Sequence, residues 1–156
     1  MTRYPNLLEL HRYHPYGEPA MCDHAGIEPE LLHAVLYDGE PLEHAEIMGL
    51  VRLYGCPAGV LLHRGTIMLD MGRRRHRAMA EEVCALYAGL QHMADAGNQD
   101  AGKYLGYAEG RFRRFQEAVG HDRLSYCHYL WMRERLLQYM RFATPKPGRR
   151  QLRHCN

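Results

Sequence analysis

Residues 17–62 read GEPAMCDHAGIEPELLHAVLYDGEPLEHAEIMGLVRLYGCPAGVLL, and this stretch decides the fold of the first part of the chain. Its pattern predicts a short helix, a tight turn at Gly26-Ile27, a second short helix, a loop marked by Gly and Pro, and an amphipathic helix. The sequence Ala25-Gly26-Ile27 ends one helix and starts the next at once, because glycine readily adopts the backbone conformation that terminates a helix. Two short helices joined in this way form the arrangement that a helix-turn-helix requires.

The apolar positions around this turn follow a fixed order along the chain. After the second short helix, a further series at helical spacing starts at Ile47 and is stopped by Gly55. In this order the sequence resembles the Cro/C1-type helix-turn-helix family of phage repressors and small bacterial regulators, over roughly the first two-fifths of the chain. The positions that carry the resemblance are Asn6-Leu7-Leu8 in the first helix, Met21 and Cys22 in the second, Gly26-Ile27 in the turn, Leu32, Val35 and Leu36 in the recognition helix, Asp38-Gly39-Glu40-Pro41-Leu42 in the loop, Ile47, Leu50, Val51 and Tyr54 in the next helix, and Leu61-Leu62 as the final apolar pair.

The resemblance implies an all-α protein whose residues 1–65 form a lambda-repressor-like helix-turn-helix domain. Behind it we expect a helical C-terminal region over residues 66–143. At the junction, Ile67-Met68-Leu69 predicts either a brief strand or an extended connector. Residues 144–156 hold Pro, Gly and basic residues without an apolar pattern, so we expect a disordered basic tail there.

Apolar residues in the C-terminal region recur at intervals of four and three, which predicts two long helices and a third. Gly97 ends the first of them, and Asn98 or Asp100 can cap the second. Gly120 closes the second helix, and we expect Asp122 to cap the third. The short joints imply an antiparallel helical hairpin plus one more helix. The repeating residues are Met79, Val83, Leu86, Leu90, Met93, Leu105, Ala108, Phe112, Phe115, Val119, Tyr126, Leu130, Leu137 and Met140.

The positions that face DNA in the resembled family carry unusual residues here. By the resemblance, Glu28, Pro29, Glu30 and His33 occupy the places at which a recognition helix meets base edges. No Arg, Lys, Gln or Asn occurs from Glu18 through Leu36. Arg, Asn and Gln are the side chains that read guanine and adenine, whereas phosphate repels carboxylates. Direct reading of a duplex by this helix is therefore disfavoured.

Two functions remain open at this point. The resemblance implies a DNA-binding transcriptional regulator of bacterial or phage type, with double-stranded DNA as its partner. The acidic recognition helix favours an adaptor instead, which uses a degenerate helix-turn-helix for protein–protein interaction and its C-terminal helices for self-association. In both cases we expect a homo-oligomer.

The net charge of +2 hides an asymmetry between the two halves of the sequence. Residues 1–65 hold four Arg and no Lys against nine Asp and Glu, a net charge of −5, and residues 66–156 have a net charge of +7. Such an uneven distribution of charge indicates either that the two halves of the chain attract each other or that the basic half binds an acidic partner. The candidates for phosphate or acidic-partner contacts are Arg73, Arg74, Arg75, Arg77, Arg111 and Arg114, and Glu40, Glu43 and Glu46 are the candidate internal compensators.

Gly102, Gly106 and Gly110 recur at every fourth residue and therefore lie along one strip of a helix. Each interior glycine costs up to about 1 kcal/mol relative to alanine. Close approach of another helix would offset that cost, so the strip predicts a helix–helix or dimer contact. The alternative is a helix that is irregular or broken there.

The remaining features point to a binding protein rather than an enzyme. We expect no catalytic residues, no cofactor and no metal, because the sequence lacks a nucleophile elbow, a phosphate loop and a metal-ligand pattern. His11 and His14 lie one helical turn apart, yet no partner at a suitable spacing completes a metal site. Five scattered cysteines without a CxxC pair and the lack of a signal peptide or membrane-spanning run predict a cytoplasmic location.

Overall fold

The computed structural model describes residues 2–13 and 18–144, and within these ranges it contains eight α-helices and no strand. This confirms the prediction of an all-α protein. Apart from Thr144, the predicted basic tail lies outside the described residues, as does His14 of the histidine pair. The helices are α1 (Pro5–Tyr13), α2 (Glu18–Ala25), α3 (Pro29–Tyr37), α4 (His44–Tyr54), α5 (Ala58–Leu61), α6 (Arg74–Asp95), α7 (Gln99–Gly120) and α8 (Tyr126–Ala143).

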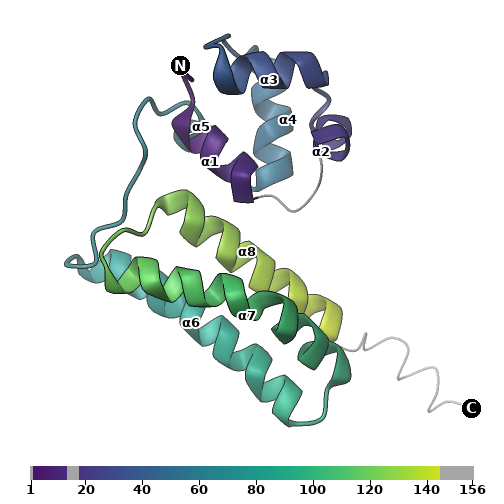
Figure 1. The fold of residues 1–156 in the computed structure, drawn as a ribbon, viewed down its shortest axis with the longest axis vertical. Coiled ribbons are helices and arrows are strands. Elements are labelled where there is room, and N and C mark those ends of the chain that lie inside the picture. The colour runs from purple at the N-terminus through teal and green to yellow at the C-terminus, as the bar shows by residue number, and fades with distance from the viewer. Residues whose placement is uncertain (1, 14–17, 145–156) are drawn as a thin grey trace, which may run out of the picture.

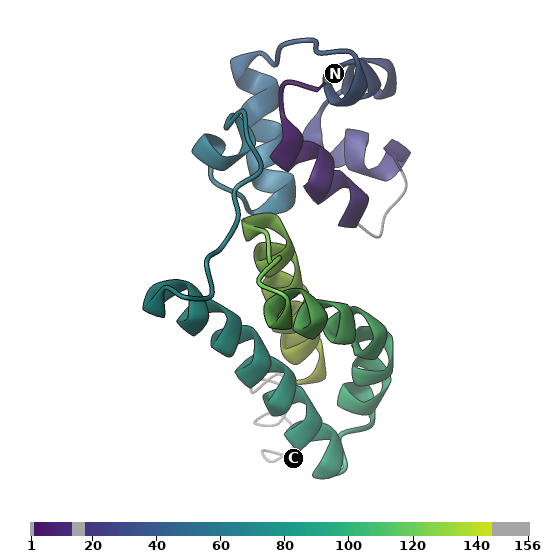
Figure 2. The same ribbon diagram turned by 60° about the vertical axis from the view of Figure 1, so that its left-hand side comes forward.

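The first five helices form one group, with α3 at its outer end (Figures 1 and 2). α2 and α3 are joined through Gly26, whose φ of +71° suits glycine, and the side chain of Ile27 is buried directly after it. α4 contacts the end of α2 at Gly49, where an added Cβ would lie 2.0 Å from the carbonyl oxygen of Ala25. Glycine is therefore required for the two helices to approach this closely. As predicted, α4 ends at Gly55, which takes a left-handed conformation.

The last three helices are long and pack against one another, with α7 antiparallel to both α6 and α8 (Figure 1). Their apolar repeat supplies the core, with Val83 and Leu90 of α6 and Phe112 and Phe115 of α7 all buried. Asn98 caps α7 as predicted, since its side-chain oxygen accepts a hydrogen bond from the backbone N–H of Ala101 at 3.0 Å.

The predicted cap of the third long helix is wrong. α8 starts at Tyr126, and its N-cap is Ser125, three residues after Asp122. The hydroxyl of Ser125 accepts a hydrogen bond from the N–H of His128 at 3.0 Å. Asp122 has a positive φ of 52° and its carboxylate accepts a hydrogen bond from the N–H of Met71 at 2.9 Å. This hydrogen bond therefore links the turn between α7 and α8 to the segment that precedes α6.

Residues 62–73 connect the two groups of helices as an extended segment rather than a strand. Met68 pairs with Ser125 in an isolated antiparallel bridge. In this bridge the N–H of Leu69 donates to the oxygen of Leu124 at 2.8 Å, and the N–H of Tyr126 donates to that of Ile67 at 2.9 Å. The connector is thus bound to the start of α8, which agrees with the second of the two sequence alternatives.

The buried side chain of Asn6 holds the connector to the first group. Its Nδ2 donates to the carbonyl oxygens of Val60 and Gly65, at 3.2 and 2.9 Å, and its Oδ1 accepts from the N–H of Ile67 at 3.1 Å. α1 also contacts α8 directly, and the hydroxyl of Ser125 donates to the carboxylate of Glu9. The two groups of helices are therefore joined by α1, α8 and the connector.

Candidate functional site

The four predicted recognition-helix positions lie at the N-cap of α3 and in its first half. Glu28, Pro29, Glu30 and His33 are all exposed. The ring of His33 lies against that of Tyr37, with 4.8 Å between the ring centroids. The opposite side of α3 is the core side, where Leu32, Val35 and Leu36 are buried. Glu30 and His33 therefore lie on the side of α3 that faces away from the core, and Glu28 and Pro29 are exposed at its start.

This surface is acidic over its whole length. The sequence has no Lys or Arg from residue 13 to residue 51. Asp38 and Glu40, which follow α3 in the loop toward α4, are exposed as well. One cation does approach the loop, since the guanidinium of Arg3 donates a hydrogen bond to the carbonyl oxygen of Gly39. We call the exposed residues Glu28, Glu30, His33, Asp38 and Glu40 the acidic face.

Glu43 and Glu46, two of the acids that were expected to compensate the arginine cluster, stabilise the start of α4 instead. Glu43 and Glu46 form a capping box at the start of α4, in which the N–H of Glu43 donates to the Glu46 carboxylate at 2.8 Å. In the described part of the chain, no ion pair joins Glu40, Glu43 or Glu46 to an arginine. The suggestion that these three acids compensate the arginine cluster within the chain is therefore wrong.

The arginine cluster lies at the start of α6, well separated from α3 in both views (Figures 1 and 2). Arg73, Arg74 and Arg75 are exposed. Arg77 is partly engaged, because its Nε donates to the carbonyl oxygen of Met71 at 3.1 Å. The cluster and the acidic face thus form two separate surfaces of opposite charge.

The second basic group and the glycine strip lie on α7. Arg111 and Arg114 are exposed. Phe112 and Phe115, which lie next to them in the sequence, are buried in the core, as their helical spacing predicts. Gly102, Gly106 and Gly110 are exposed, and an added Cβ at any of them would meet nothing within 4 Å. α7 runs unbroken from Gln99 to Gly120, so the alternative of a broken helix is wrong. A dimer contact through the strip stays a prediction.

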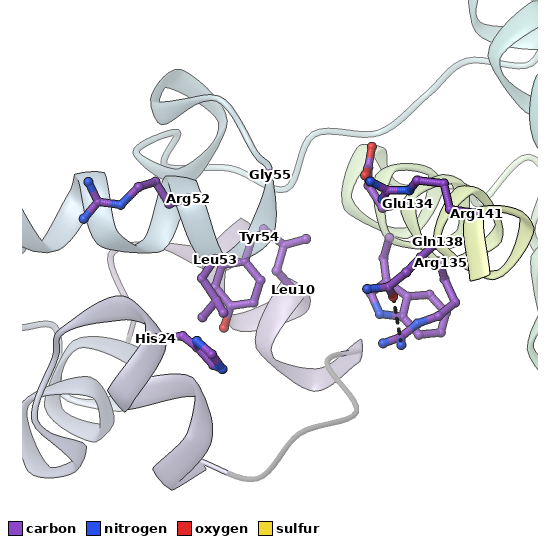
Figure 3. A pocket seen from close by; sticks show the side chains of 11 residues that line it. Leu10, His24, Arg52, Leu53, Tyr54, Gly55, Glu134, Arg135, Gln138 and Arg141 are labelled. Carbon is purple, nitrogen blue, oxygen red and sulfur yellow. Dashed lines mark hydrogen bonds between the residues drawn. The ribbon is translucent and has the colours of Figure 1, made fainter. Parts of the chain in front are cut away.

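A cleft that sequence reasoning missed lies between the first group of helices and α8 (Figure 3). Its volume is about 530 Å³. In Figure 3, Leu10, Tyr54 and His24 lie on one side of it, and Glu134, Arg135, Gln138 and Arg141 lie on the other. Trp131 of α8 and Arg52 of α4 also contribute to the lining, and Arg52 extends away from α8. We call this cavity the α8 cleft.

The α8 cleft carries unbalanced positive charge. Its one carboxylate, Glu134, is bound by the guanidinium of Arg133 at 2.8 Å. Arg135 and Arg141 form no ion pair in the described part of the chain. The Arg135 guanidinium lies over the ring of Trp131, 5.7 Å from its centroid, and donates a weak hydrogen bond to Gln138 at 3.5 Å. These contacts orient Arg135 but leave its charge uncompensated.

Aromatic rings connect the cleft to the interior between α1, α7 and α8. Tyr13 stacks on both Trp131 and His128, with centroid distances of 5.6 and 4.9 Å. The edge of the His128 ring meets Phe115 at 5.6 Å. Burial among these rings lowers the pKa of His128 from 6.5 to about 4, because it disfavours the charged imidazolium. His128 is therefore neutral at pH 7 and serves the packing of α1 on α8.

The cleft could not be located from sequence because its lining comes from four helices that are far apart along the chain. Nothing in the sequence indicates that α1, α2 and α4 pack beside Trp131 and Arg135 of α8. In the described ranges, no three His, Cys, Asp or Glu side chains gather as metal ligands. Nor does any helix in these ranges combine the length and apolarity needed to cross a bilayer. Comparisons with protein-family models, with curated proteins and with solved structures gave no match to this chain.

Proposed function

We propose that this chain is a binding protein built on a Cro/C1-like helix-turn-helix scaffold, and that its acidic face binds a basic segment of a protein partner. The observation that carries the proposal is the exposed surface of α3 and the following loop. It presents Glu28, Glu30, Asp38 and Glu40, and the sequence has no Lys or Arg from residue 13 to residue 51, although Arg3 from outside this range donates to the carbonyl oxygen of Gly39.

The charge of this surface distinguishes a protein partner from a duplex. A DNA duplex exposes two phosphates for every base pair, so an acidic helix entering the groove is repelled along its whole length. Carboxylates accept from the cytosine amino group but offer nothing to guanine or adenine acceptors. A Lys- or Arg-rich protein segment is instead attracted over several ångströms and can pair with the same carboxylates. An adaptor is the function that these side chains support best.

Titration with a short peptide of alternating Arg and Ala tests this proposal. We expect saturable binding by the full chain, followed through the anisotropy of the labelled peptide. The variant Glu28→Gln/Glu30→Gln should weaken the binding at least fivefold, because it removes charge from the centre of the acidic face. The matched control Glu109→Gln/Glu117→Gln removes the same charge from the exposed surface of α7 and should leave the affinity within twofold. Equal losses in the two variants would mean that net charge alone, rather than the acidic face, binds the peptide.

DNA-binding transcription regulation is a second candidate, which two other observations favour. α2 and α3 are joined by a tight turn and leave one side of α3 exposed, as the resembled family requires. Arg73, Arg74 and Arg75 are exposed without acidic partners in the described part of the chain and could contact phosphates.

The salt dependence of binding to random duplex DNA separates the candidates. A regulator should bind at low salt and lose affinity steeply as salt rises, and Arg73→Ala/Arg74→Ala/Arg75→Ala should abolish that binding. An adaptor should show no measurable binding near physiological salt. Duplex binding that survives the triple substitution would contradict the assignment of phosphate contacts to the arginine cluster.

A further inference from the structure

We propose that the α8 cleft is a binding site for a small organic anion, which places a phosphate or carboxylate head against Arg135 and Arg141 and an apolar body against Leu10 and Tyr54. This site is separate from the acidic face and does not depend on the proposed function. Its occupant would contact both groups of helices at once, since the two arginines belong to α8 while Leu10 and Tyr54 belong to α1 and α4.

The size of the cleft fits a ligand of this kind. Its volume of about 530 Å³ falls within the range of roughly 300–1,000 Å³ that is usual for small-molecule sites. Such sites combine an apolar lining with a few charged or polar groups that fix the orientation of the ligand. Here the partly exposed Leu53 and Trp131 provide most of the apolar part, and the buried Leu10 and Tyr54 add the little surface that they expose. The charged groups are concentrated on the α8 side (Figure 3).

The charge of the cleft selects an anion. Glu134 shares the guanidinium of Arg133 with Glu82, and the three arginines of the lining, Arg52, Arg135 and Arg141, outnumber this one carboxylate. Arg135 is only partly exposed and is held over the rings of Trp131 and Tyr139, with distances of 5.7 and 5.9 Å to their centroids. A guanidinium fixed in this way loses little conformational freedom when it binds an oxyanion, and its planar fork suits phosphate and carboxylate alike.

The only tryptophan of the chain, Trp131, lies in the lining and gives a direct readout. We would titrate the full-length protein with phenyl phosphate and, separately, with phenylacetate, and follow the Trp131 emission. Inorganic phosphate tests the head group without an apolar body, and benzyl alcohol tests the body without a charge. The proposal expects saturable binding of at least one of the two organic anions, and the better of them identifies the head group as phosphate or carboxylate.

Three variants locate the binding. Arg135→Gln/Arg141→Gln should weaken the better anion at least tenfold. Arg141→Gln alone, at an exposed position without a cation–π contact to Trp131, should weaken it severalfold while leaving the emission of the unliganded protein unchanged. The control Arg111→Gln removes a guanidinium that also lies over Trp131, at 5.3 Å from the centroid, but that does not line the cleft. It should change the emission of the unliganded protein and leave the affinity within twofold.

Several results would overturn the proposal. They are the absence of a saturable change with both organic anions, equal affinity for benzyl alcohol, and equal affinity for inorganic phosphate. Unchanged affinity in the double variant would also overturn it, because the arginines would then play no part.

Discussion

His128 makes the free energy of unfolding depend on pH, and its buried surroundings determine the direction of that dependence. Its ring lies between Tyr13 of α1 and Phe115 of α7, and burial there lowers its pKa from 6.5 to about 4. The folded protein therefore keeps His128 neutral, while the unfolded chain takes up a proton as the pH falls below about 6.5. The contribution of this residue is present above pH 6.5 and is lost as the pH falls toward 4.

The magnitude follows from the difference between the two pKa values. A shift from 6.5 to about 4 corresponds to about 3 kcal/mol once the titration is complete, and about 2 kcal/mol of this is lost between pH 7.5 and pH 5. The carboxylate of Glu9 lies in the same cluster, where it accepts hydrogen bonds from Tyr13 and Ser125.

Urea unfolding of the wild type and of His128→Phe at pH 7.5 and pH 5 isolates this contribution. Phenylalanine keeps the ring contacts and removes the titrating group. Because the other histidines contribute equally to both proteins, we expect the wild type to lose about 2 kcal/mol more than the variant over this range. His92→Gln, at an exposed position on α6, should follow the wild type. Parallel pH dependence in the wild type and His128→Phe would refute the reasoning.

Three further predictions concern stability and reactivity. Gly49→Ala should destabilise the fold by several kcal/mol, since the new methyl group would lie 2.0 Å from a backbone oxygen. Gly106→Ala should instead stabilise the monomer by up to about 1 kcal/mol, since nothing lies within 4 Å of the added Cβ. Urea unfolding checks both changes, and light scattering that shows a weaker dimer in Gly106→Ala would reveal contact through the glycine strip. Asn6→Ala should lower the free energy of unfolding by about 2–3 kcal/mol, because it leaves backbone groups of Val60 and the connector without their hydrogen-bond partners. Thermal or urea unfolding measures this, and a loss under 1 kcal/mol would show that Asn6 does not hold the connector in place. Burial raises the pKa of the Cys56 thiol to about 11, so its alkylation at pH 8 should be much slower in the native protein than in urea, and equal rates would show that the site is open.

Local signals in the sequence were sufficient for most helices and their ends. The turn at Gly26, the end of α4 at Gly55 and the cap at Asn98 each depend on neighbouring residues alone, and the structure has all three. The repeat that placed Val83 in a core likewise depends only on helical periodicity. Residue 65, after which the sequence predicts a domain boundary, lies in the extended connector between the two groups of helices.

Features that depend on tertiary contacts could not be predicted in the same way. Asp122 looked like a helix cap because its residue type is suited to that position, yet its carboxylate binds the N–H of Met71, fifty-one residues away. Asn6 matched a helix position of the resembled family, and its sequence neighbours gave no sign of its hydrogen bonds to Val60 of α5 and to Gly65 and Ile67 of the connector. The α8 cleft depends in turn on how α1 packs against α8, which no local pattern specifies.

The partner of the acidic face can be tested most directly by recording amide chemical shifts of the ¹⁵N-labelled full chain near physiological salt, first with random duplex DNA and then with the Arg–Ala peptide. We predict that the peptide shifts the amides of α3 and the following loop, around Glu28, Glu30 and Glu40, and that the duplex leaves them in place. Shifts at these amides on adding duplex, with none from the peptide, would contradict the account and identify α3 as a reader of DNA.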